Sequence, residues 1–234
     1  ALDAITTGDN NTAIGYNALT ANTTGGSSTA VGYGAGAAIT TAGNLTAVGY
    51  NSFTANTSGS DNVGLGKHAG LSITTGGYNV AVGSESLRTN VSGVNNAAVG
   101  FKALYANTAN NNASFGYESM AANTTGTSNT AVGPYAMTAN TSGSSNVAVG
   151  MQALDGATTA SNNVAIGNTA MSAVVTGSNN VGIGMEALLV HTSGTQNVSI
   201  GQASMKANTT GSNNTAVGAL ALTNNTSSYN TALG

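Results

Sequence analysis

The chain has 234 residues, of which only four are Lys or Arg and seven are Asp or Glu, so its formal net charge is −3 at pH 7. A chain with so few cations is not expected to bind nucleic acid or an anionic membrane surface. It contains no cysteine, which excludes disulfides and thiolate metal sites. It also lacks an apolar run of about 18 residues, so we expect no membrane insertion by this segment.

The organising feature is a phrase of the type Asn-Thr-Ala-Val-Gly, which first occurs at residues 11–15. Its glycine, called here the repeat glycine, returns at intervals of 17 residues in eleven cases and 16 in two. The fourteen repeat glycines are Gly15, Gly32, Gly49, Gly66, Gly83, Gly100, Gly116, Gly133, Gly150, Gly167, Gly184, Gly201, Gly218 and Gly234. Such a fixed period predicts one structural unit stacked many times. We therefore predict an all-β parallel β-solenoid of about 14 coils, with residues 1–234 as a single array.

The three residues before each repeat glycine are predicted to form a short strand. The residue directly before the glycine is always Val, Ile, Leu or Phe, and the one before that is always Ala, Ser or Gly. Alternation with a period of two in β-branched residues is typical of a strand. We expect the bulky side chains to be buried. We expect the small-residue face to be closely covered, either by the opposite wall of the coil or by a neighbouring chain, and we interpret it as a seam between chains.

A second inward-facing segment follows each repeat glycine. The third residue after the glycine is Ala or Ser in all thirteen cases, and the fourth is Leu, Met or Phe in eleven. The two exceptions are Gly36 and Gly70, and in those coils alone an isoleucine, Ile39 or Ile73, comes three residues later. Because an empty cavity would cost a few kcal/mol, we predict that these isoleucines fill the space from the other side.

The rest of each repeat, such as residues 21–25, carries the Asn, Thr and Gly of turns and is predicted to be an outer loop. Asn also stands four places before the repeat glycine in twelve of fourteen repeats, with Ser28 and Leu45 as exceptions. Stacked asparagines can bond from coil to coil as a ladder. Both ends of the sequence fall inside the repeat and no polar cap is visible, so we expect a segment of a longer fibre.

The strings at residues 146–150 (Asn-Val-Ala-Val-Gly), 163–167 and 180–184 resemble the core motif of the head repeats of trimeric autotransporter adhesins, the YadA-like heads. Residues 11–19 also resemble repeats of phage tail fibres and related surface fibres. The resemblance covers essentially the whole chain. It implies a left-handed β-roll, three chains side by side as a homotrimer, and an extracellular location on a cell or a virion. Here the period is longer than in the shorter head repeat, and the coiled-coil stalk and membrane anchor of that family are not contained in this segment.

Catalysis requires titratable or nucleophilic groups held close together. The two histidines, His68 and His191, are seven coils apart and are expected to be loop residues on a solvated face. The Asp residues are scattered and the calcium-binding nonapeptide pattern is missing. We therefore predict no catalytic residue, no metal site and no cofactor, and expect that the protein is not an enzyme.

Two surface rows are candidates for ligand binding. Tyr16, Tyr33 and Tyr50 directly follow successive repeat glycines, and Phe101 and Tyr117 occupy the same place later. Such rings stack either on sugars or, more simply, on one another. A Thr row in the outer loop suggests ice binding, although Val91 and Val175 interrupt it; its members are Thr23, Thr40, Thr57, Thr74, Thr108, Thr124, Thr141 and Thr158. Residues 22–24 and their equivalents also match the N-glycosylation acceptor pattern.

From these features we expect a structural and adhesive fibre segment that acts as a rigid spacer and attaches to a host surface through a glycan or protein receptor. Repeated weak contacts would give such a fibre avidity. The alternative is a monomeric ligand-binding solenoid, for glycan or, with less support, for ice.

Overall fold

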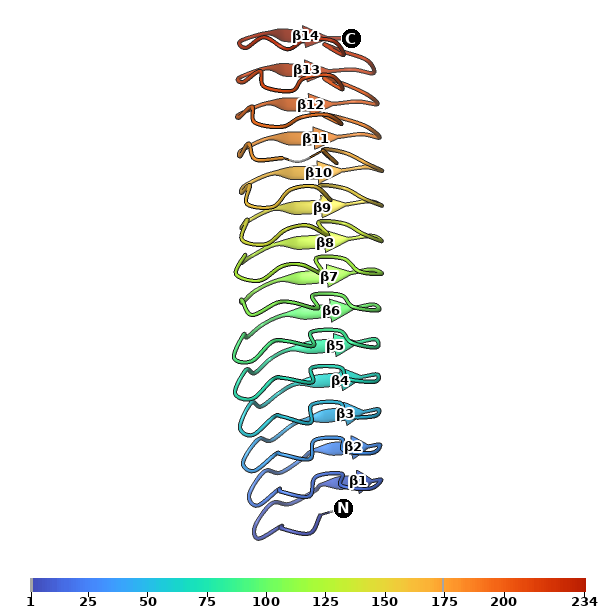
Figure 1. Ribbon diagram of the computed structural model, residues 1–234, viewed down its shortest axis with the longest axis vertical. Helices are drawn as coiled ribbons and strands as arrows, with labels where there is room; N and C mark the ends of the chain where they lie inside the picture. The colour runs from blue at the N-terminus through green and yellow to red at the C-terminus, as the bar shows by residue number, and fades with distance from the viewer. Residues whose placement is uncertain (1, 174) are drawn as a thin grey trace. The chain divides into compact units, whose positions relative to one another are not determined.

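The computed structural model describes residues 2–173 and 175–234, and it confirms an all-β parallel solenoid. The chain divides into two compact units, Ala1–Ser114 and Phe115–Gly234. In each unit one short strand is followed by a turn and a loop, and successive coils lie one above another (Figure 1). The fourteen strands follow one another in the sheet in the order of the sequence.

Each strand has three residues and ends directly before a repeat glycine, as predicted. The first unit contains β1 (Thr12–Ile14), β2 (Thr29–Val31), β3 (Thr46–Val48), β4 (Val63–Leu65), β5 (Val80–Val82) and β6 (Ala97–Val99). The strand β7 (Ala113–Phe115) crosses the boundary between the units. The second unit contains β8 (Thr130–Val132), β9 (Val147–Val149), β10 (Val164–Ile166), β11 (Val181–Ile183), β12 (Val198–Ile200), β13 (Thr215–Val217) and β14 (Thr231–Leu233).

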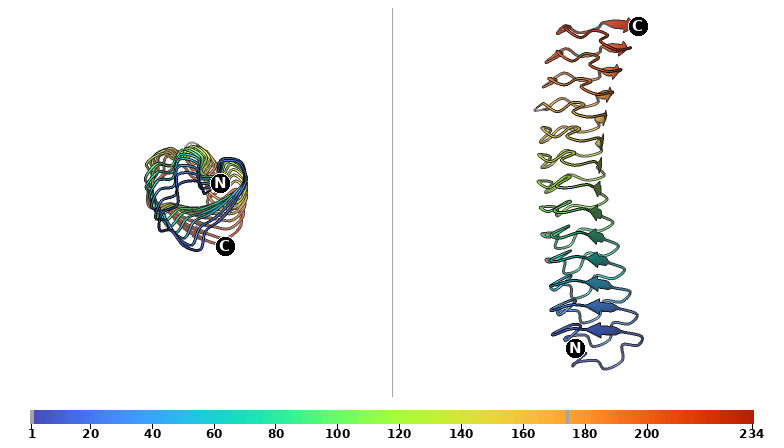
Figure 2. Two further views of the ribbon diagram at one scale, coloured as in Figure 1. Left: turned by 90° about the horizontal axis from the view of Figure 1, so that it is seen from below. Right: turned by 90° about the vertical axis from the view of Figure 1, so that its right-hand side faces the viewer.

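The strands pair in parallel with a register of one full repeat. In β1 and β2, for example, Ala13 lies opposite Ala30 and Ile14 lies opposite Val31. The same register holds from β1 to β6 and from β8 to β14. Equivalent residues of successive coils therefore form columns along each unit. The side view in Figure 2 shows the strands of each unit on one side of the coil and the loops on the other.

The repeat glycines are required by both conformation and space. Gly49 has φ +130°, a value that L-residues rarely adopt, and a Cβ there would lie 2.5 Å from the carbonyl oxygen of Gly66 in the next coil. From Gly15 to Gly83 and from Gly116 to Gly201, every repeat glycine has a positive φ and a comparable contact with the next repeat glycine of its unit. The column of glycines thus lets the chain turn sharply after each strand while successive coils stay in contact.

The interior of each coil is filled by the residue four places after the repeat glycine, which we call the core residue. The fully buried core residues are Leu19, Phe53, Leu87, Leu104, Met120, Met137, Leu154, Met171, Leu188 and Met205. The predicted compensation at the two exceptions is confirmed, because Ile39 and Ile73 are also fully buried. A Cβ added to Gly36 would lie 2.8 Å from Cδ1 of Ile39, so the isoleucine occupies the space that the glycine leaves.

The two faces of the strands are oriented opposite to the prediction. The small residues in the middle of β2 to β13 are all buried, whereas none of the residues on either side of them is. The small residues pack against the core residues of their own chain. A Cβ on Gly64 would lie 2.4 Å from the Phe53 ring, and one on Gly182 would lie 2.9 Å from Cγ of Met171. The predicted seam of small residues is therefore the inner wall of the coil, and the expectation that the bulky residues are buried is wrong.

The asparagine ladder is confirmed. Asn163 Oδ1 accepts from the backbone N–H of Asn180 at 2.9 Å, and Asn180 Oδ1 accepts from that of Asn197 at 3.0 Å. The amide nitrogens of the ladder also donate across the coil, as Asn180 Nδ2 does to Gly194 O at 3.0 Å. Because the side chains in this column are buried, these bonds satisfy polar groups that cannot reach water.

Candidate functional surface

The described part of the chain has no pocket, so a function of the residues in it must be sought on the surface. Nor do the described residues include a group of three His, Cys, Asp or Glu side chains that could hold a metal ion. Within residues 2–173 and 175–234 no helix is long and apolar enough to cross a membrane.

The most extensive surface feature is the outer strand face, which we define as the first and third residues of each strand. These residues are Thr, Val or Ala in first place and Ile, Val, Leu or Phe in third place. The side chains in third place are partly or largely exposed, for example 39% for Leu65, 39% for Val132 and 37% for Ile166. Since strand pairing puts like positions above one another, each unit presents a continuous strip that is apolar along its third-place column and carries no charge.

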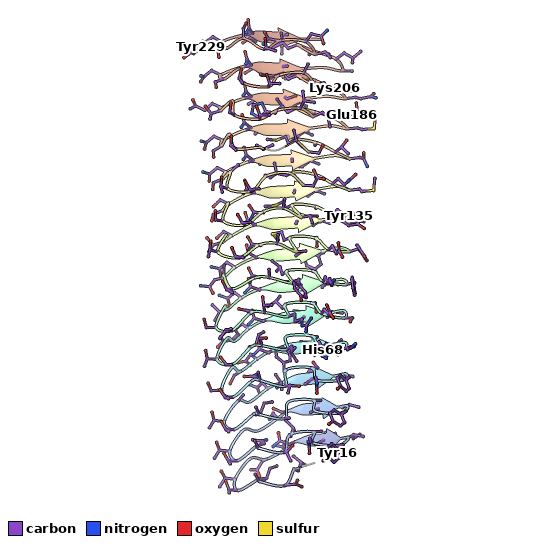
Figure 3. The ribbon with its side chains drawn as sticks, viewed as in Figure 1. Tyr16, His68, Tyr135, Glu186, Lys206 and Tyr229 are labelled. Atoms are coloured by element: carbon purple, nitrogen blue, oxygen red, sulfur yellow. The ribbon has the colours of Figure 1, made fainter. Side chains whose placement is uncertain are left out.

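The predicted aromatic row is a stack. Tyr33 lies between Tyr16 and Tyr50, with ring centroids 5.3 Å apart on both sides and interplanar angles of 20° and 12°. His68 continues the stack against Tyr50 at 5.5 Å with a tilt of 60°. Figure 3 shows Tyr16 and His68 at the edge of the first unit where the strands end. The rings therefore contact one another, as in the simpler of the two predictions, and their outer edges face solvent.

The other two predicted aromatic residues have different surroundings. Phe101 lies beside Lys102, whose Nζ is 5.2 Å from the centre of its ring. Tyr117, in the second unit, contacts Tyr135 edge-to-face at 5.3 Å. The nearby Glu118 carboxylate raises the pKa of the Tyr117 hydroxyl above its ordinary value. Neither residue lies in a cavity, so their exposed surface is the only part available to a ligand.

A group of basic residues that was not singled out from the sequence lies beside the aromatic residues of the first unit. Lys67, Arg88 and Lys102 come from three successive coils and are three of the four cations in the chain. Arg88 and Lys102 both lie 5.6 Å from the centre of the Tyr105 ring. The signal was present in the sequence, because such a concentration of cations is unusual in a chain that is otherwise nearly uncharged.

The Thr row is engaged in bonds within the chain. The hydroxyl of Thr141 donates to the carbonyl oxygen of Thr158 in the next coil at 3.0 Å, and Thr23 donates to Thr40 at 2.9 Å. At Val175 the row continues with the next residue. Val175 is buried, and the Thr176 hydroxyl donates to Thr192 O in its place. These hydroxyls are already committed as donors, which counts against a surface that orders ice through them.

The N-glycosylation pattern is also explained by the fold. Its asparagine, for example Asn22, is fully buried and bonds to both the N–H and the carbonyl oxygen of Gly25. The equivalent asparagines Asn56, Asn90, Asn123, Asn140 and Asn208 are likewise fully buried. An acceptor asparagine must reach solvent, so the pattern at these positions reflects loop geometry rather than glycosylation.

The two histidines differ from the prediction and from each other. His191 is fully buried rather than solvated, because it replaces the loop asparagine. Its Nε2 lies 2.8 Å from Gly194 O and its Nδ1 lies 3.1 Å from Asn208 O. Burial lowers the pKa of His191, and the two carbonyl contacts oppose that effect in part. His68 is partly exposed, and its pKa is lowered by burial and by the nearby charges of Lys67 and Arg88.

Comparison of the chain with protein-family models, with curated proteins and with solved structures found no match. The fold and the surface geometry are therefore the basis for a functional proposal.

Proposed function

We propose that the protein is a structural and adhesive fibre segment, a left-handed β-roll that associates side by side as a homotrimer on the surface of a cell or a virion. The observation that supports this proposal is the exposure of the outer strand face. Monomeric soluble proteins rarely expose contiguous apolar patches larger than a few hundred Å². In each unit this strip runs through every strand, with side chains such as Leu65 and Ile166 exposed by 39% and 37%.

A second copy of this chain is the partner that fits the strip best. The strip repeats with the strand spacing, and another copy carries the same spacing, so apolar residues would meet apolar residues along the contact. It contains no charge that would require a complementary partner, such as an acidic or basic ligand. Interface cores are depleted of charged residues, and homodimer interfaces are more apolar than the rest of a protein surface.

The width of the strip favours three copies. Only two side chains of each strand point outward, and the repeat glycine directly after them turns the chain away. Three such narrow strips can cover one another around a common axis, whereas a two-sheet sandwich would leave part of each strip uncovered. The resemblance of the repeats to trimeric fibre heads supports the same number.

An extracellular fibre role rests on the same surface. Loops that are almost uncharged and repeat in register can present the same weak contact many times, and avidity then increases with their number. The alternative of a monomeric ice-binding solenoid is less well supported, because the Thr141 and Thr23 hydroxyls donate to the backbone of the next coil.

The experiment is a particle-mass measurement by sedimentation or light scattering. We expect a mass three times the 22.6 kDa of the chain. The variant Val149→Asp/Ile166→Asp places two carboxylates on the outer strand face and should give a folded monomer. The control is Met151→Asp/Met185→Asp, since these side chains are more exposed than Val149 and Ile166, at 47% and 46%, and lie beyond the repeat glycine. The control should remain a trimer. A folded wild-type monomer, or a trimer that survives both strand substitutions, would contradict the proposal.

A further inference from the structure

We infer that the coils between Gly66 and Tyr105 form a binding site for an anionic glycan, one that carries sulfate or carboxylate groups. The site consists of Lys67, Arg88 and Lys102 with the rings of Phe101 and Tyr105, and we call it the basic-aromatic patch. It deepens the attachment role proposed above by naming a ligand class. It lies on residues that follow the repeat glycine, away from the outer strand face, so it does not depend on the oligomer.

The charge balance of the patch is positive. It contains three cations and one carboxylate, Glu85, whose Oε1 lies 3.6 Å from Nη1 of Arg88. In the described residues neither Lys67 nor Lys102 forms an ion pair with a carboxylate. The remaining cation of the chain, Lys206, is instead paired with Glu186 at 2.7 Å, and Figure 3 shows the two side chains next to each other in the second unit. The patch therefore offers charges that the protein itself does not neutralise.

The cations are held in place by the rings. The guanidinium of Arg88 lies 5.6 Å from the centre of the Tyr105 ring, and its Nη1 lies 3.1 Å from the Tyr105 hydroxyl. Nζ of Lys102 lies 5.2 Å from the centre of Phe101 and 5.6 Å from that of Tyr105. An ammonium group over two rings keeps N–H donors free for another partner. Ordering these long side chains in advance lowers the entropy cost of binding an anion.

The charges converge on one region of the surface. His68 lies in the same coil as Lys67 and contacts Tyr50, and its pKa is lowered by burial and by the positive charges of Lys67 and Arg88. The Glu85 carboxylate acts in the opposite direction. The surface around His68 is thus positive overall, although the chain as a whole carries a net charge of −3.

The chemistry of the patch fits a charged sugar better than other anions. The exposed part of Phe101 offers apolar surface to the C–H groups of a sugar ring, while the lysines offer donors to its sulfate or carboxylate groups. Nucleic-acid binding depends on neutralising many phosphates in a row, and the other coils of the first unit contain no Lys or Arg. The site therefore suits a few anionic groups on a glycan chain.

The test is titration calorimetry with a sulfated glycosaminoglycan oligosaccharide and with the same chain made neutral by chemical desulfation and reduction of its carboxyl groups. We expect the wild-type protein to bind the sulfated chain at least tenfold more tightly and to lose affinity as salt rises. Lys67→Gln/Lys102→Gln should weaken that binding at least tenfold. Glutamine is tolerated at the place of Lys102, since Gln152 adopts the same positive φ there, +54° against +53°.

The matched control is Lys206→Gln, which removes the paired cation and should change the affinity less than twofold. Equal affinity for the sulfated and the neutral chains would overturn the inference, as would an equal loss in Lys206→Gln. Single-stranded DNA with the same number of charges should bind more weakly than the sulfated glycan, and equal binding would show a non-specific anion surface instead. A monomer by mass that still binds the sulfated chain would contradict the trimer and leave this inference intact.

Discussion

The two faces of each strand differ in side-chain size and in burial. On the inner face the middle residue is Ala, Ser or Gly and is buried, for example Ala148 of β9. On the outer face of the same strand Val147 and Val149 remain partly exposed. The inner face is small because the core residue supplies the volume, as Phe53 does where its ring lies against Gly64. The difference teaches that in a narrow coil a large core residue leaves room for only a small residue in the middle of the facing strand.

The largest expected effect on stability is that of removing the side chain of a core residue. Leu154 is fully buried, so Leu154→Ala should lower the free energy of unfolding by about 2–5 kcal/mol through lost burial and a residual cavity. Met151→Ala in the same coil removes an exposed side chain and should change it by less than about 0.5 kcal/mol. Denaturant unfolding with hydrogen exchange in the coil of Leu154 measures both. Similar losses of unfolding free energy in the two variants would contradict the distinction between the inner and outer parts of the coil.

A smaller effect is expected where the inner wall is made larger. A Cβ on Gly64 would lie 2.4 Å from the Phe53 ring, so Gly64→Ala should destabilise the protein by about 1–3 kcal/mol through overpacking. Phe53→Leu introduces the residue type that is commonest at this place in the other coils, and it should relieve that contact. Ser52 Oγ, at 2.6 Å from the same Cβ, is no obstacle, because the equivalent pair Ser86 and Ala98 occurs in the structure.

A double-mutant cycle measures this coupling. In the Phe53→Leu background Gly64→Ala should cost less than in the wild type, with a favourable interaction of about 0.5–3 kcal/mol between the two substitutions. Additive effects of the two changes would mean that Gly64 and Phe53 do not share one volume. The interpretation of the small-residue face as the inner wall would then lose its main support.

Most of the fold could be predicted from the sequence because the same pattern of residues recurs in every repeat. The period, the strand before each glycine, the buried core residue and the substitution of Ile39 and Ile73 for it follow from spacing and volume. The side of the strand that faces inward did not follow. Alternation shows which residues share a face, but a column of alanines can be covered by its own coil or by another chain. Only the position of the core residue, as at Phe53 and Gly64, decides between them.

The backbone conformation of the core residues could not be predicted from the sequence either. Leu19, Phe53 and the other core residues adopt φ near +50°, a region that bulky residues avoid. The residue types do not indicate a positive φ. The conformation is imposed by hydrogen bonds between successive coils, such as the one from Phe53 N–H to Ala69 O at 3.0 Å. The burial of His191 was hidden for a related reason: its place is normally held by Asn, and a lone polar residue in a loop suggests solvent exposure.

The smallest predicted effect concerns His191, where a titratable ring stands on the buried side of the loop. Burial lowers the pKa of this ring below its ordinary value of about 6.5, so the unfolded chain binds a proton more readily than the folded one. Its contribution to stability is therefore fully present above about pH 6.5 and is lost as the pH falls through and below that value. His191→Asn restores the residue found at Asn208 and its equivalents, and it should remove this part of the pH dependence.

Hydrogen exchange of residues 188–208 at pH values between 5 and 8, in the wild type and in His191→Asn, measures the difference directly. His68 is present in both proteins, so its own titration cancels in the comparison. We expect the protection factors of the two proteins to run in parallel above pH 7, and that of the wild type to fall more as the solution becomes acidic. If the wild type gained protection on acidification instead, the contacts of Nδ1 and Nε2 with Asn208 O and Gly194 O would outweigh burial. The inner side of the loop would then accommodate a charge, although the His191 side chain is fully buried there.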